Sequence, residues 1–109
     1  MKIQILGAEW KIIDRDGARD ERLSDCAGYC DWTTREIVVE KNPGGNLGNI
    51  DAYLRKVKRH EIVHAFFFES GLQECSGDVE AWAFNETMVD WIAIMGERIY
   101  KAWQDAGAV

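Results

Sequence analysis

The chain has 109 residues, 47% of them apolar, which suits one domain with a single modest core. Its 19 acidic residues outnumber its 13 Lys and Arg residues, so the net charge is −6, and neither nucleic acid nor an anionic membrane is expected as the main partner. Apolar runs stay short, Met1–Leu6 is too short and polar for a secretory signal, and three Cys do not make a disulfide framework. We therefore expect a cytoplasmic protein with reduced thiols.

The first forty residues carry the pattern of short strands. Lys2–Leu6 alternates polar and apolar residues, and Glu9–Asp14 forms a second candidate strand after a Gly-Ala turn. Residues 14–24 are mostly charged and are expected to form a solvated loop. Cys26–Trp32 is a third candidate strand, and Glu36–Glu40, which is β-branched and bounded by charge, is the clearest one.

The pattern changes after the Gly-rich connection at 42–48, which has the residues of a plain loop. Asn49 is placed to cap a helix over Ile50–Ser70, and Gly71 is placed to end it. A second long helix is expected from about Asp78 to Gln104. The fold class is therefore α+β, with a small antiparallel or mixed sheet of three or four strands packed on two long helices in a single domain.

The first of these helices contains His60-Glu61-Ile62-Val63-His64, the His-Glu-x-x-His signature of zinc peptidases. Residues four apart lie on one face of a helix, so both imidazoles can reach one cation. Glu61 can flank the ion without binding it, close to a water molecule that the metal activates. This pattern predicts His60 and His64 as zinc ligands and Glu61 as the catalytic base.

A catalytic zinc site normally has three protein ligands, and the chain contains no third His. Glu86 and Asp90 lie four residues apart on the second expected helix, so one can ligate while the other accepts the outer N–H of a ligating imidazole. Glu80, in the expected first turn of that helix, is the rival third ligand, and Cys75 is a further candidate. Glu86 is favoured over Glu80 because only Glu86 has an acidic partner four residues on.

His60-Glu61-x-x-His64 followed by Asn85-Glu86-x-x-x-Asp90 resembles the gluzincin metallopeptidases. The resemblance implies that Glu86 is the third zinc ligand and that Asp90 supports the first His. It also implies a zincin-like fold, a minimal form of the gluzincin catalytic subdomain over residues 1–109. The stretch from Arg59 to Leu72, with Met88-Val89-Asp90-Trp91, resembles small bacteriophage-encoded metallopeptidase-like proteins, which implies the cytoplasm of a host cell.

The expected function is hydrolysis of peptide bonds by a zinc-activated water, with a peptide or protein as the substrate partner. An exposed strand edge can pair with an extended substrate, and Glu36–Glu40 is one candidate for that edge. Larger gluzincins use a His or Tyr from a second subdomain to stabilise the oxyanion, so Tyr29, Tyr53 and Tyr100 are candidates for this role here.

Two other interpretations stay open. The chain could be a zinc-binding regulatory or interaction module without turnover, or a latent enzyme whose own terminus blocks the cleft. The pair Cys26 and Cys30 lacks further ligands for a structural zinc, so both thiols are expected to pack as small hydrophobic groups in a strand. Trp82, Trp91 and Trp103 are expected in the core or at an interface rather than in substrate stacking.

Overall fold

The structure is a computed structural model, and it describes residues 1–75 and 86–109. In these residues the chain forms a sheet, two short 3₁₀ segments and α-helices. The elements are β1 (Lys2–Ile5), β2 (Ala8–Arg15), η1 (Gly17–Arg19), η2 (Glu21–Leu23), β3 (Gly28–Asp31), β4 (Glu36–Glu40), α1 (Ile50–Glu69), α2 (Leu72–Cys75) and α3 (Glu86–Asp105). The α+β class is confirmed.

The sheet is mixed, and its strand order is β1-β2-β4-β3. β1 and β2 form an antiparallel hairpin, β2 pairs in parallel with β4, and β3 pairs antiparallel with β4. Ile37 of β4 therefore lies between Ile12 of β2 and Cys30 of β3. The predicted strand Glu36–Glu40 has the predicted bounds, but it lies inside the sheet, so its candidacy as the exposed edge was wrong. β3 and β1 are the edge strands in the described part of the chain.

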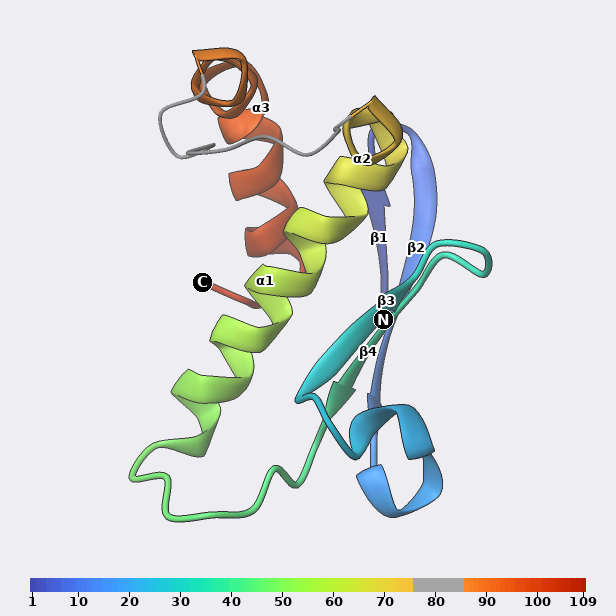
Figure 1. The fold of residues 1–109 in the computed structure, drawn as a ribbon. Coiled ribbons are helices and arrows are strands. Elements are labelled where there is room, and N and C mark those ends of the chain that lie inside the picture. Colours follow the sequence, from blue (N-terminus) through green and yellow to red (C-terminus); the bar gives the residue numbers. More distant parts are fainter. Residues whose placement is uncertain (76–85) are drawn as a thin grey trace.

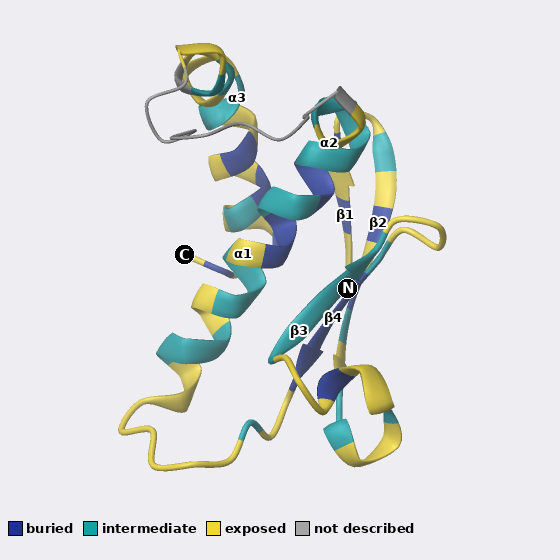
Figure 2. Cartoon of the chain, in the orientation of Figure 1, coloured by how far each residue is buried: buried dark blue, intermediate teal, exposed yellow. Residues whose placement is uncertain are grey.

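The helices α1 and α3 lie against the same face of the sheet (Figure 1). The buried residues gather where these two helices and the sheet face one another (Figure 2). Trp10 and Phe66, 0% and 1% exposed, are the largest side chains buried there. The strand residues of this core alternate along the chain, as a sheet with one face on a helix layer requires, and they include Ile3, Ile5, Trp10, Ile12, Ile37 and Val39.

The opposite face of the sheet is partly covered by the segment between β2 and β3. Sequence analysis predicted a solvated loop over residues 14–24, yet Leu23 in this segment is buried. Tyr29 explains the order of the segment, because its hydroxyl donates to Asp20 Oδ2 at 2.5 Å and accepts from Arg15 Nη1 at 3.2 Å. The Arg22 guanidinium lies 3.9 Å from the centre of the Tyr29 ring. A local pattern of charged residues cannot predict these long-range contacts.

Both ends of α1 follow the predicted signals. Asn49 Oδ1 accepts a hydrogen bond from Ala52 N at 3.0 Å, which caps the helix, and Gly71 adopts a φ of 79° just after it. The last residue of the helix is tied to the sheet layer, because Glu69 Oε1 accepts from Trp10 Nε1 at 2.8 Å and from Arg35 Nε at 2.5 Å. These contacts fix where α1 ends relative to the sheet.

The second half of the chain differs in part from the prediction. Leu72–Cys75, between the two helices predicted from the sequence, forms the helical turn α2. The expected start of the second long helix, near Asp78, lies outside the described residues, and α3 is described from Glu86 onward. Trp91 and Trp103 pack against the core as expected, whereas Trp82 lies outside the described residues. Among the helices of the described ranges, none has the length and apolar character needed to cross a bilayer.

Candidate metal and catalytic site

The candidate site lies on α1, in the turns that carry His60, Glu61 and His64. One side of this helix is buried against the sheet and α3, through residues that include Ile62, Ala65 and Phe66. His60 points away from that packing and its side chain is 67% exposed, whereas His64 is half-buried. The helix therefore presents the two imidazoles at the border between the core and the solvent.

The two imidazoles face each other through the same nitrogen. His60 Nε2 and His64 Nε2 lie 3.2 Å apart, and the ring centres are separated by 4.8 Å. Two nitrogens bound to one tetrahedral zinc, each at about 2.0–2.1 Å, stand about 3.3 Å apart. The His pair thus has the nitrogen separation that two ligands of one zinc ion require.

The surroundings of His64 favour its neutral form. Burial, together with the neighbouring His60, lowers the pKa of His64 below the ordinary histidine value. A neutral imidazole has a free lone pair, whereas a protonated one must lose its proton before it can ligate. The site therefore favours ligation by His64 at neutral pH.

Glu61 lies on the side of α1 that faces β3 and is only 6% exposed. Its Oε1 atom is 3.9 Å from His60 Nε2. Burial raises the pKa of Glu61 above the ordinary carboxyl value, and the nearby His60 opposes this only in part. A buried carboxylate with a raised pKa, next to two converging imidazoles, has the surroundings of a general base.

Gly28 allows α1 to approach the start of β3 closely. A Cβ atom at this position would stand 2.9 Å from both Val38 O and Val57 Cγ1, and 3.4 Å from Glu61 Cγ. A side chain of any size would therefore press against both the neighbouring strand and the helix. The absence of a side chain at Gly28 lets Glu61 pack directly beside the edge strand.

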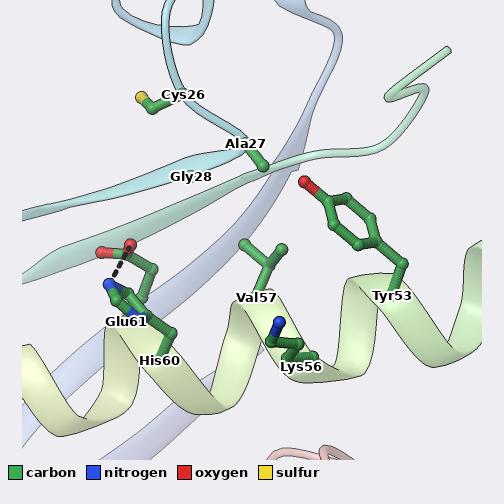
Figure 3. Close-up of a pocket in the computed structure, with 8 residues that line it drawn as sticks. All are labelled: Cys26, Ala27, Gly28, Tyr53, Lys56, Val57, His60 and Glu61. Atoms are coloured by element: carbon green, nitrogen blue, oxygen red, sulfur yellow. Dashed lines mark ion pairs between the residues drawn. The ribbon is translucent and has the colours of Figure 1, made fainter. Parts of the chain in front are cut away.

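Two pockets flank Glu61 along the line between α1 and β3. The first has a volume of about 240 Å³, and Figure 3 shows the side chains of Tyr53, Val57 and Glu61 directed from α1 toward the strands. Its lining is Cys26, Ala27, Gly28, Tyr53, Lys56, Val57, His60 and Glu61. The second, of about 340 Å³, is lined by Tyr29, Cys30, Glu61, His64, Phe68 and Gln73. An extended ligand lying across Glu61 would reach both pockets.

The proposed third ligand is not brought to the His pair in this structure. Residues 1–75 and 86–109 contain no group of three or more His, Cys, Asp or Glu residues that could hold a metal. Glu86 and Asp90 are both exposed on the N-terminal part of α3. Their roles stay predictions, as does that of the rival Glu80, which lies outside the described residues. Cys75 ends α2, and its side chain also lies outside the description.

The tyrosines proposed for the oxyanion differ in their surroundings. Tyr29 borders the second pocket, but its hydroxyl is engaged by Asp20 and Arg15, and burial raises its pKa. Tyr100 is 52% exposed on α3. Tyr53 lines the same pocket as Glu61 but lies eight residues before it, about 12 Å along the axis of α1, so its role stays a prediction.

The two described thiols behave differently. Cys30 is half-buried and packs against the core, and burial, with the charges of Glu61 and Asp31, raises its pKa to about 12. It acts as a small hydrophobic group, as predicted. Cys26 was expected in the strand but precedes it, is exposed, and donates its thiol hydrogen to Arg22 O over 3.0 Å.

Sequence reasoning did not single out Lys56 or Gly28, which border the pocket beside Glu61. The signal available was the spacing of Tyr53, Val57 and Glu61, which repeats every four residues and so lines one face of the helix. In comparisons with known proteins, no family model, curated protein or solved structure matches this chain. The resemblance to gluzincins therefore depends on the motif residues.

Proposed function

We propose that the protein is a zinc-dependent metallopeptidase in which His60 and His64 bind the metal and Glu61 acts as general base. The observation that supports this most is the 3.2 Å separation of the two Nε2 atoms, next to a buried glutamate. Packing alone does not require two histidines to direct their Nε2 atoms toward each other at the surface. The proposed setting is the cytoplasm, of a host cell if the chain is phage-encoded.

A bound zinc ion would supply Lewis acidity, which acidifies water and polarises a peptide carbonyl. Glu61 takes the proton of the attacking water and returns it to the amine that leaves. Its raised pKa suits the first step, because a carboxylate that binds a proton more readily is the better base.

Glu86 is the proposed third ligand, and Asp90 the proposed acceptor for the outer N–H of a ligating imidazole. The proposal requires the first turn of α3 to come to the His pair when zinc binds. The rings of Phe67 and Trp91 are in edge contact at 5.2 Å, and the Phe67 ring also meets His64 at 6.3 Å. This contact keeps the part of α3 that follows Glu86 and Asp90 beside the turn of α1 that follows His64.

The proposed substrate is an extended peptide that adds to the outer edge of β3. Among the residues that the structure describes, this strand pairs with β4 alone, and it runs beside α1 between the two pockets that meet at Glu61. Trp32, at the turn after β3, stacks on Phe68 with ring centres 5.5 Å apart, so the far end of this groove has an aromatic wall. Main-chain hydrogen bonds to an edge strand bind peptides with little dependence on sequence.

A zinc-binding module without turnover is the second candidate function. It is favoured by one observation, namely that no three-residue ligand group exists among the residues that the structure describes. A site with two histidines and no carboxylate ligand would bind zinc weakly and would not need a base. The two candidates differ in what Glu61 does once the metal is bound.

The deciding experiment measures bound zinc and peptide cleavage in the same purified samples. The metallopeptidase predicts that Glu61→Gln keeps zinc and loses cleavage, and that His60→Ala and Glu86→Gln lose zinc. Glu97→Gln is the control for Glu86→Gln, because both residues are exposed on α3. Zinc in the wild type without cleavage would support the module, and failure to bind zinc at any concentration would refute both.

A further inference from the structure

The pocket between Tyr53 and Glu61 contains a positive charge that the proposed chemistry does not use. We propose that this pocket binds a carboxylate of the substrate, on the C-terminal side of the scissile bond, and that Lys56 is the residue that recognises it. The inference rests on the proposed metallopeptidase function and adds a substrate class to it, namely peptides with an acidic group just after the cleaved bond.

The charge pattern of α1 supports an acidic ligand. Residues 55–59, Arg-Lys-Val-Lys-Arg, place four cations directly before His60 in a chain whose net charge is −6. Arg59 donates from Nη1 to Ala108 O at 2.8 Å, so this cation is engaged with the C-terminal segment. Lys56 lines the pocket and forms no ion pair with any residue in the described ranges. Its ammonium group is therefore available to a ligand.

The walls of the pocket suit a carboxylate on a short apolar stem. Figure 3 shows the Lys56 side chain in front of α1, below the side chain of Val57, and the Tyr53 hydroxyl directed toward Ala27. Val57 and Ala27 offer apolar surface for methylene groups, while Lys56 and Tyr53 offer donors at the polar end. A glutamate side chain and the α-carboxylate of a peptide end share this chemistry, and the experiment below separates them.

The position of Lys56 along α1 sets how far the recognised carboxylate lies from the cleaved bond. Lys56 lies five positions before Glu61, which is about 7.5 Å along a helix axis. An extended peptide advances about 3.3 Å per residue, so this distance covers about two residues. The acidic group is therefore expected at the first or second residue from the scissile bond.

The direction of β3 decides whether the acidic residue of the substrate lies before or after the scissile bond. β3 and α1 run in the same direction, because Gly28 is next to Val57 whereas Cys30 shares a pocket with His64 and Phe68. A peptide that pairs antiparallel with β3, the slightly more stable arrangement, runs from Phe68 toward Lys56. Its residues after the scissile bond then enter the Lys56 pocket.

The test uses blocked hexapeptides that carry Glu or Gln at each position in turn, with either an amidated or a free C-terminus. Binding is measured on the zinc-treated Glu61→Gln variant, and kcat/KM on protein with Glu61 intact. Each series is repeated in Lys56→Gln and in the control Lys58→Gln, which removes a neighbouring charge that does not line the pocket. We expect about a five-fold preference for Glu over Gln. It should vanish in Lys56→Gln and persist in Lys58→Gln.

The outcomes separate this inference from the function on which it rests. An acid preference in binding that depends on Lys56, with no cleavage of any peptide, would support the pocket and refute the peptidase. Cleavage with equal rates for Glu and Gln peptides would support the peptidase and overturn the role of Lys56. A preference for the free C-terminus alone assigns the pocket to an α-carboxylate, and a preference for internal Glu assigns it to a side chain. An acid preference that is restricted to residues before the bond would overturn the stated direction.

Discussion

Replacing Gly28 by Ala tests whether the close packing of β3 on α1 is what holds Glu61 in place. The added Cβ would stand 2.9 Å from Val38 O and from Val57 Cγ1, closer than ordinary Cβ contacts. Val38 O belongs to the backbone of a paired strand and cannot rotate away, so β3 and α1 must separate slightly. Overpacking of this kind costs about 1–3 kcal/mol. We therefore expect Gly28→Ala to lower the free energy of unfolding by about 2 kcal/mol.

The assay is urea unfolding followed by tryptophan fluorescence, to which the buried Trp10 contributes. With a urea m-value of about 1–3 kcal/mol/M, this loss moves the midpoint down by about 1 M. Gly96→Ala is the matched control, because a Cβ there meets nothing within 4 Å and alanine favours the helix by about 1 kcal/mol. If Gly28→Ala unfolds within about 0.5 kcal/mol of the wild type, the close approach does not constrain the site and our argument fails.

Four further changes follow from contacts already described. Phe66→Ala leaves a cavity in the core and should cost about 3–5 kcal/mol by calorimetry, and a loss below about 1 kcal/mol would contradict its burial. Asn49→Ala removes the cap of α1 and should cost about 1 kcal/mol, whereas Asn49→Asp should retain most of the stability. The hydrogen bond from Tyr29 holds the pKa of Asp20 below its ordinary value, so its stabilisation is complete above about pH 4 and lost as pH falls further. Asp20→Asn should therefore lower the urea midpoint at pH 7 but not at the acid end of the range, and an equal loss at both pH values would exclude the ionic cause. Burial raises the pKa of Glu61, so its ionisation costs stability above its folded pKa and nothing below about pH 4. Metal-free Glu61→Gln should accordingly be more stable than the wild type at pH 7, and an unchanged midpoint there would show that the carboxylate is not penalised.

The elements that the sequence predicts well are those whose signals are local. Glu36–Glu40 has the predicted bounds because its β-branched residues and flanking charges act within the strand. Asn49 and Gly71 set the ends of α1 because capping and positive φ are properties of single residues. The sheet order could not be predicted, since the parallel pairing of β2 with β4 joins residues about 25 apart in the chain. For the same reason, the sequence pattern did not predict that Leu23 is buried.

In the candidate site, too, local signals predict some residues well and others poorly. His60, Glu61 and His64 are on one helix, so the spacing alone predicts that the imidazoles converge and that Glu61 lies beside them. The proposed third ligand would come from a separate helix, and its position would depend on how α3 packs and on a metal whose binding energy would be coupled to that packing. Helical periodicity predicts that Glu86 and Asp90 share a face, but it does not predict which surface of the protein that face meets.

The tie between Glu69 and the two donors Trp10 and Arg35 has a consequence for metal exchange. Because α1 is anchored to the sheet at its C-terminal end and held against Gly28 near its middle, the His pair keeps its spacing by protein contacts alone. In the proposed zinc enzyme, a chelator should then remove the ion without unfolding α1, and only the first turn of α3 would have to move when zinc is added back. The two imidazoles would stay in place without metal, unlike the ligands of small zinc fingers, which unfold when their zinc is removed.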